Sequence, residues 1–309
     1  MLAILLKTLP FFAVIGTGFL AARFRLLSPE ATGQLTRFVF YFALSAMLFG
    51  FAANLSLAEI FSLPFVLAYT LATGLVWALV LAAGLFRGTG REAALFEAHT
   101  GVIGNVGFLG IPMLVLLLGP GAVGPVLLVL AVDLIVFSSI LTLLITLFRS
   151  GRVGPDTLRV LTVGLLKNPM IVSTVLGLAW GATGWQLWPP VQDYMTLLGA
   201  AATPCALFAI GASLAGRRPD RPLVAAWLSF AKLVLHPAAV AVAALLVFPV
   251  EPYAAGVMIA AAALPVAGNV FILAESYGVA PQRVSTAILI STALSVLTVT
   301  AVIALMETT

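Results

Sequence analysis

Two hydrophobic segments of this chain contain helix-breaking residues near their centres, one segment in each half. The first reads Gly-Asn-Val-Gly-Phe-Leu-Gly-Ile-Pro over residues 104–112, and the second reads Leu-Pro-Val-Ala-Gly-Asn over residues 264–269. Proline removes a backbone donor and clashes with the preceding turn, and glycine destabilises a helix by about 1 kcal/mol relative to alanine. Inside a bilayer, each backbone group freed in this way needs a partner in the protein or in a water-filled cavity.

The composition is that of a polytopic membrane protein. The 309-residue chain is 62% hydrophobic and 8% charged, whereas a soluble domain carries about 25% charged residues. A membrane-spanning helix needs about 20 predominantly apolar residues. Ten stretches meet this requirement: 3–22, 34–54, 62–86, 93–118, 123–148, 158–181, 189–215, 222–248, 252–275 and 284–306. We therefore predict an all-α membrane protein with ten transmembrane helices.

The positive charges alternate with the predicted spans. Of the 15 Lys and Arg residues, Lys7, Lys167 and Lys232 lie inside spans. The other 12 lie in or beside the connections after spans 1, 3, 5, 7 and 9: Arg23, Arg25, Arg37, Arg87, Arg91, Arg149, Arg152, Arg159, Arg217, Arg218, Arg221 and Arg283. The alternate connections contain Glu59 and Glu251 and no Lys or Arg. The positive-inside rule then predicts a plasma (inner) membrane protein with cytoplasmic Arg-bearing connections and both termini extracytoplasmic. The basic charge is attributed to this orientation and not to nucleic-acid binding.

The chain divides into two predicted repeats of five spans, residues 1–148 and 158–309, joined by a cytoplasmic linker at 149–157. Because five is odd, the second repeat enters the membrane in the opposite orientation. Weak matches at an offset of 159 support the repeat: Leu9-Pro10 with Asn168-Pro169, and Ala46-Met47-Leu48-Phe49 with Cys205-Ala206-Leu207-Phe208. In the fourth spans, Gly110-Ile111-Pro112-Met113 matches Ala263-Leu264-Pro265-Val266 at an offset of 153.

An inverted repeat with a broken fourth span in each half predicts that the two breaks cross near the midplane. Paired, discontinuous helices of this kind mark the binding site of secondary transporters. Half-helix N-termini present free N–H groups and about half a positive charge, which suits an anion. The candidate residues beside the breaks are Asn105, Gly107, Pro112, Pro265 and Asn269. The alternative is that these residues only kink their helices, because Gly and Pro are frequent in membrane helices.

The break at 104–112 closely resembles the fourth-span signature of the auxin efflux carrier family, which includes plant auxin exporters and bacterial permeases, some of them malonate transporters. Four further stretches are similar to the same family: Leu-Lys-Asn-Pro at 166–169, Pro-Cys-Ala-Leu-Phe-Ala-Ile-Gly-Ala-Ser-Leu at 204–214, Lys-Leu-Val-Leu-His-Pro at 232–237, and Leu-Pro-Val-Ala-Gly-Asn-Val-Phe at 264–271. The resemblance extends over the whole chain. Ser45 departs from it, because a proline matching Pro204 is expected there.

The resemblance implies a scaffold of spans 1, 2, 6 and 7 and a transport domain of spans 3–5 and 8–10. Substrate would bind between them at the crossing, with Pro204 and Ser45 among the neighbouring residues. The resemblance also implies elevator-like movement of the transport domain and a homodimer.

Three ionisable residues are placed deep in spans. Asp133 lies near the middle of span 5, where an ionised carboxylate is costly unless it is paired or hydrated. Lys232 and His236 are four residues apart in span 8 and therefore lie on one helix face. They are candidates for proton coupling, for pairing with Asp133 or for attracting an anion. The alternative is a structural polar cluster.

These patterns predict a secondary transporter of small organic anions, either carboxylates or auxin-like acids. A cation/proton antiporter or sodium-coupled symporter of the same fold class is the alternative, although such carriers usually place acidic residues at the crossing. A membrane receptor or an intramembrane enzyme would need a signalling domain or a catalytic dyad, and neither is found. Two His and one Cys do not form a metal site of the usual spacing, and no phosphate-binding Gly-rich loop is found. We expect no cofactor.

Overall fold

The computed structural model describes residues 2–55, 60–151, 154–215 and 220–306. Within these ranges every regular element is a helix, and the one β-type pairing is an isolated bridge between Gly104 and Val266. The predicted all-α fold class is therefore confirmed. Glu59, Arg152, Arg217 and Arg218, which contributed to the predicted orientation, lie outside the described residues.

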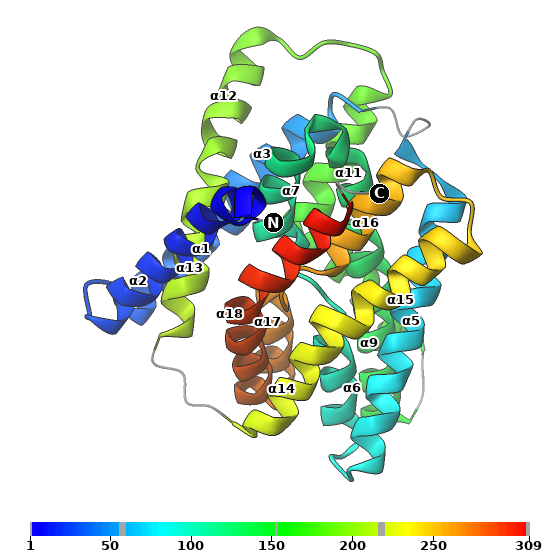
Figure 1. The fold of residues 1–309 in the computed structure, drawn as a ribbon. Coiled ribbons are helices and arrows are strands. Elements are labelled where there is room, and N and C mark those ends of the chain that lie inside the picture. Colours follow the sequence, from blue (N-terminus) through cyan, green and yellow to red (C-terminus); the bar gives the residue numbers. More distant parts are fainter. Residues whose placement is uncertain (1, 56–59, 152–153, 216–219, 307–309) are drawn as a thin grey trace.

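The α-helices form two series of comparable length (Figure 1). The first series is α1 (Leu2–Arg23), α2 (Pro29–Phe38), α3 (Leu44–Ala52), α5 (Leu63–Phe86), α6 (Arg91–Thr100), α7 (Ile111–Leu118), α8 (Val123–Ala131) and α9 (Ser138–Ser150). The second is α10 (Pro155–Lys167), α11 (Pro169–Gly181), α12 (Pro189–Ala200), α13 (Ala202–Leu214), α14 (Pro222–Phe230), α15 (His236–Val242), α16 (Pro252–Ala262), α17 (Gly268–Tyr277) and α18 (Pro281–Met306).

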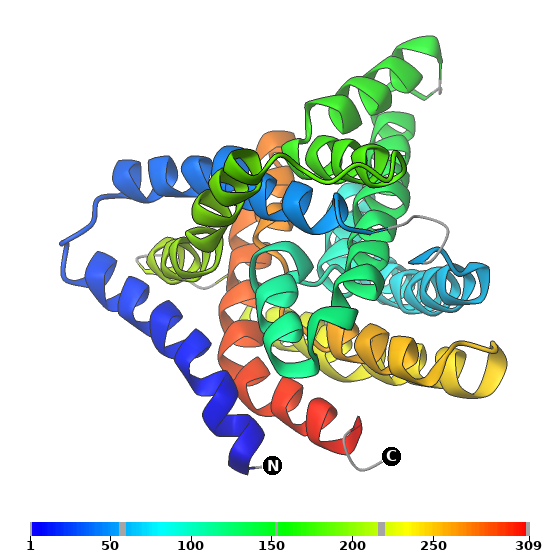
Figure 2. The ribbon, with the colours of Figure 1, turned by 90° about the horizontal axis from the view of Figure 1, so that it is seen from above.

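Short turns of other helical types join several of these helices. The π-helical turns are η1 (Val39–Ala43), η2 (Val106–Gly110), η4 (Val132–Phe137), η5 (Ala231–Leu235) and η6 (Ala243–Val247), and η3 (Pro120–Ala122) is a 3₁₀ turn. In the view from above, α1 and α5 lie on opposite sides of the molecule (Figure 2). In Figure 1, α12 lies at the top and the α5–α6 connection lies at the bottom.

Seven helices of the described chain are long and apolar enough to cross a membrane, or eight if one bent pair counts as a span. The seven are Leu5–Arg23, Pro29–Ala52, Leu63–Phe86, Pro120–Arg149, Pro189–Leu214, Pro222–Val247 and Pro281–Leu305. This finding confirms a multi-pass membrane protein. The predicted spans 93–118 and 252–275 are each divided into shorter helices, so the total of ten spans stays a prediction.

The bent pair consists of α10 and α11, which meet at an angle of 70° around Asn168. A residue before proline is pushed out of the helical region, and Asn168 precedes Pro169 with φ −81° and ψ 109°. The Asn168 Oδ1 atom accepts a hydrogen bond from Met170 N at 3.0 Å and so caps α11. The matching residue Pro10 does not interrupt α1, because no comparable cap stops the helix there.

Two close helix contacts relate the halves of the chain reciprocally. A Cβ atom at Gly18 of α1 would lie 2.0 Å from the carbonyl oxygen of Phe208 in α13. A Cβ atom at Gly177 of α11 would lie 2.7 Å from the carbonyl oxygen of Phe49 in α3. Gly177 follows Gly18 by 159 residues, and Phe208 follows Phe49 by the same 159. Each half thus contributes a glycine that lets the other half's backbone approach closely.

The Gly18 contact can be tested by adding a single methyl group. We expect Gly18→Ala to destabilise the protein by about 1–3 kcal/mol or more, because the contact atom is backbone and the helices must separate. The measurement is thermal unfolding in detergent. Gly16→Ala is the matched control in the same helix, since nothing lies within 4 Å of a Cβ atom there. Equal melting temperatures for the two variants would contradict a tight α1–α13 contact.

Candidate functional site

The two interrupted segments lie beside each other in the interior. The first, residues 101–105, follows α6, and the second, residues 263–267, follows α16. Asn105 N donates to Pro265 O at 2.8 Å, and Ala267 N donates to Ile103 O at 3.0 Å. We call residues 101–105 and 263–267 the paired segments. Their backbone groups are satisfied by each other, which meets the requirement that buried backbone places on any broken helix.

The pairing has its own register. The residues of the two hydrogen bonds exchange roles at an offset of 162, because 267 − 105 and 265 − 103 both equal 162. The fourth-span offset of 153 predicted from the sequence is therefore wrong by nine residues. It matched Pro112 with Pro265, whereas Pro265 lies in a paired segment and Pro112 lies in the first turn of α7. The sequence match followed the proline, and the fold followed the backbone hydrogen bonds.

The two asparagine side chains face a common cavity. A chamber of about 640 Å³ is lined by Asn105 and Asn269, and an adjoining chamber of about 490 Å³ is also lined by Asn269. Both chambers extend toward the α1–α2 connection or the end of α17, where the Arg-bearing connections lie, and together we call them the Arg-side cavity. Asn105 is 5% exposed and its amide has no hydrogen-bond partner among the described residues. The Asn269 Oδ1 atom is also buried without a partner in this part of the chain. These amides are available to a ligand.

The wall of the Arg-side cavity includes a helix N-terminus and an aromatic pair. Helix α17 begins at Gly268 without a side-chain cap, so its first N–H groups lie beside Asn269. Phe108 lines both chambers and stacks on Phe40, with ring centroids 6.4 Å apart and planes 8° from parallel. Together these features offer donors for an anionic group and an apolar surface for the rest of a small molecule.

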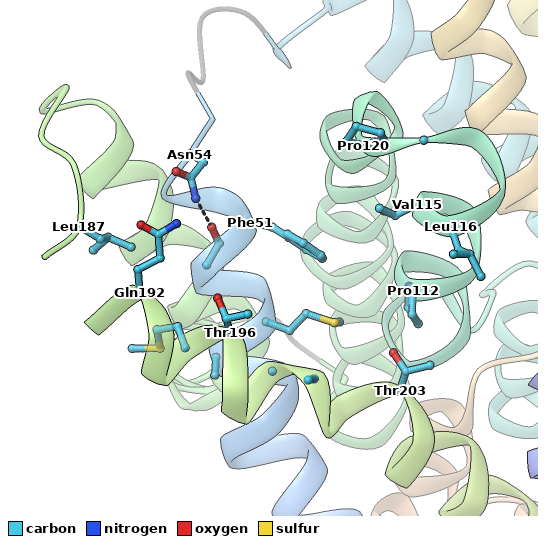
Figure 3. A pocket seen from close by; sticks show the side chains of 17 residues that line it. Phe51, Asn54, Pro112, Val115, Leu116, Pro120, Leu187, Gln192, Thr196 and Thr203 are labelled. Carbon is cyan, nitrogen blue, oxygen red and sulfur yellow. Dashed lines mark hydrogen bonds between the residues drawn. The ribbon is translucent and has the colours of Figure 1, made fainter. Parts of the chain in front are cut away.

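A second cavity of about 730 Å³ lies toward the other end of the molecule (Figure 3). We call it the far-side cavity. Helices α3, α7, α12 and α13 form it, and Pro112, Asn54, Gln192 and Thr203 are among its lining residues. In Figure 3, the Asn54 side chain is hydrogen-bonded to Gly50 O, at 2.7 Å. Pro112 thus lines a different cavity from the two asparagines.

Gly107 lies against the scaffold-side helix α11. A Cβ atom at Gly107 would lie 2.4 Å from the terminal methyl carbon of Met170 and 3.8 Å from a Leu44 methyl carbon. Met170 and Leu44 are both buried. Gly107 therefore gives room for a packed contact and presents no side chain to a ligand.

Ser45 and Pro204 lie next to the far-side cavity in sequence, through Ala46 and Thr203. Ser45 Oγ donates to Phe40 O at 3.2 Å across the end of η1. Pro204 lies in the first turn of α13. Span 2 therefore contains a π-helical turn where span 7 divides at Ala201, between α12 and α13.

The buried ionisable residues form a polar network beside the paired segments. Tyr69 Oη donates to Asp133 Oδ1 at 2.9 Å, and His236 Nε2 lies 3.0 Å from Thr73 Oγ1. Lys232 Nζ lies 3.2 Å from His236 Nδ1. The Tyr69 and His236 rings connect the two parts, with centroids 5.8 Å apart. Asp133 lies in η4 and Lys232 in η5, and such π-helical turns are frequent at functional sites.

Lys232 reaches the paired segments directly. Its ammonium group is 0% exposed and donates to the carbonyl oxygen of Ala262, the last residue of α16. A Cβ atom at Gly104 would lie 3.3 Å from Lys232 Nζ. Lys232 and Asp133 are absent from the ion pairs within 4.0 Å that the described residues form. The two charges therefore belong to one network without direct contact.

Sequence reasoning missed Arg37, Tyr69 and Thr73. Tyr69 and Thr73 are one helical turn apart on α5, a spacing that carries no signal in a hydrophobic helix of 24 residues. Arg37 was interpreted only as an orientation charge, yet it lines both chambers of the Arg-side cavity. Its position within the second span, several residues after the connection, was the available signal.

Comparison with known proteins agrees with this architecture. Residues 3–303 match the family model described as "Membrane transport protein". Over 306 residues, the chain is 34% identical to a protein of Rhizobium meliloti (strain 1021) named "Putative malonate transporter", covering 97% of this chain and 94% of that protein. The predicted resemblance to the auxin efflux carriers is confirmed. The chain belongs to this family of membrane transport proteins and is a transporter, not an enzyme.

Proposed function

We propose that the protein is a secondary transporter of small organic anions that binds its substrate at the paired segments. The observation that carries the proposal is the Arg-side cavity, where Asn105, Asn269 and the N-terminus of α17 leave hydrogen-bond donors without protein partners. A helix N-terminus and amide N–H groups favour a carboxylate. The relative named as a putative malonate transporter supports carboxylates as the substrate class.

An inverted repeat of five plus five spans is the architecture we propose. Two reciprocal relations support it: the Gly18–Phe208 and Gly177–Phe49 contacts at an offset of 159, and the paired segments at an offset of 162. An exchange of roles between equivalent residues is what a two-fold relation between repeats requires. The scaffold then consists of α1–α3 and α10–α13, and the transport domain consists of the remaining helices.

Alternating access by an elevator movement follows from the position of the cavities. The Arg-side and far-side cavities lie toward opposite ends of the molecule, and both are lined by helices of the proposed scaffold and transport domain. Between them, η2 packs on Met170 at Gly107. Sliding of the transport domain would exchange access from one end to the other. A homodimer held together by the scaffold, with both termini extracytoplasmic in the inner membrane, completes the proposal.

Proton coupling through Asp133, Lys232 and His236 is proposed because their network contacts the paired segments at Ala262. A buried charge at this depth is costly unless it is compensated, so a proton on Asp133 would change the balance beside the substrate. The cation/proton antiporter or sodium-coupled symporter remains the alternative within this fold class.

The anion site predicts an unequal response to two asparagine substitutions. Asn269→Ala should weaken transport roughly ten- to a hundredfold, the effect of losing a hydrogen bond to a charged group. Asn269→Asp should be at least as damaging, because a carboxylate repels an anionic substrate. The same pair at Asn105 should behave alike. Uptake of labelled malonate into proteoliposomes is the measurement, with membrane yield as the folding control. Retained or improved transport by the Asp variants would favour the cation alternative.

The orientation predicts opposite labelling of two engineered cysteines in a Cys205→Ala background. Leu26→Cys lies in the α1–α2 connection, and Ala182→Cys follows α11 at the other end; both positions are exposed. A membrane-impermeant thiol reagent should label position 182 in intact cells and position 26 only after permeabilisation. The reverse pattern would overturn the orientation.

Proton coupling predicts that the parent transports faster with a pH gradient than without one at matched membrane potential. Asp133→Asn should abolish this difference while substrate exchange continues, since exchange moves no net proton. If Asp133 instead only balances Lys232, Asp133→Asn should destabilise the fold by about 3–5 kcal/mol, and Asp133→Asn with Lys232→Met should rescue it. Equal parent rates with and without the gradient would eliminate proton coupling.

A further inference from the structure

Arg37 lies deeper than an orientation charge needs to lie. It is in the last turn of α2 and within the apolar helix Pro29–Ala52. Eight residues separate it from Pro29, or about 12 Å of helix at 1.5 Å per residue. A charge placed within a span is costly unless it faces water, a counter-ion or a ligand. Arg37 is exposed to the Arg-side cavity, so water or a ligand can reach its guanidinium.

Arg37 is not part of a structural ion pair in the described chain. Arg87 and Arg283 both pair with Glu97, and Arg149 pairs with Glu92. These arginines fasten helices to one another. Arg37 has no carboxylate within 4.0 Å among the described residues, which leaves its planar pair of donors free.

Arg37 and Asn269 belong to opposite walls of the same cavity. Both line both chambers, Arg37 from α2 of the proposed scaffold and Asn269 from α17 of the proposed transport domain. The cavity therefore contains a second group suited to an anion, separate from the paired segments. Glu275 also lines the larger chamber, and it lies six residues beyond Asn269 on α17, toward the Arg-bearing end.

We propose that Arg37 binds the second carboxylate of a dicarboxylate whose first carboxylate is held by Asn105, Asn269 and the α17 N-terminus. This inference rests on the proposed anion transport and names its substrate class. A guanidinium binds a carboxylate through two parallel hydrogen bonds, which gives both strength and direction. Arg37 thus selects dicarboxylates over monocarboxylates of the same size.

The test compares acids that differ only in the second charge. Malonate is paired with its monoamide, malonamate, and succinate with succinamate, as competitors of labelled malonate in proteoliposomes. In the parent, the diacid should compete about ten- to a hundredfold better than its monoamide in at least one pair, the effect of one charged hydrogen-bonded contact. Arg37→Gln should reduce this ratio to near one while the monoamide competes as before. Arg37→Lys should keep an intermediate ratio, because lysine retains the charge without the fork.

Two further variants separate selectivity from other roles. Arg23→Gln removes an exposed arginine at the end of α1 that does not line either chamber and should keep the parent ratio. Glu275→Gln should also keep it; a matching loss would show that Arg37 acts by pairing with Glu275, and the inference would be wrong.

The outcomes distinguish this inference from the proposed function. If the parent takes up no carboxylate, the proposed function itself fails. If the parent transports carboxylates but does not discriminate diacid from monoamide, Arg37 is not a selectivity residue. If Arg37→Gln weakens diacid and monoamide equally, or abolishes monoamide competition, anion transport stands and the assignment of Arg37 is overturned.

Discussion

The two backbone hydrogen bonds between the paired segments are the constraint on which the rest of the structure depends. An interrupted helix inside an apolar environment exposes donors and acceptors that water would otherwise satisfy, and each unsatisfied group is costly. Here Asn105 N and Ala267 N find the carbonyls of Pro265 and Ile103. Neither break can therefore exist without the other. The two halves of the chain must bring them to the same depth in opposite directions, which an inverted repeat does.

Part of this arrangement was predictable from the sequence. The breaks at 104–112 and 264–269 are visible because Gly, Pro and Asn interrupt long apolar runs, and Gly18 and Phe49 lie at the same 159-residue offset as the sequence matches. The register of the paired segments was not predictable. It is set by which carbonyl meets which N–H, and Pro112 misled the match because its side chain, not its backbone role, resembles Pro265. Backbone pairing leaves little trace in residue type.

The polar residues show the same division. Asp133, Lys232 and His236 attract attention because ionisable groups are rare in apolar spans, and the structure joins them in one network. Their partners Tyr69 and Thr73 are ordinary in a membrane helix, and the Lys232 acceptor is a main-chain oxygen with no identity in the sequence. Arg37 was hidden for a different reason: an arginine beside a cytoplasmic connection already had an explanation.

The charge arrangement at the paired segments bears on the choice between an anion and a cation as ligand. The C-terminal end of a half-helix offers carbonyl oxygens, which in sodium-coupled carriers can hold the ion. Here the carbonyl of Ala262 at the end of α16 already accepts from Lys232, whose ammonium is buried against Gly104. A free cation at that end would have to displace a lysine tethered to the same chain and would meet its positive charge. The N-terminal end of α17, by contrast, faces the Arg-side cavity with no side-chain cap. With the carbonyl end occupied and the N–H end open, the geometry favours a negatively charged ligand over a sodium ion.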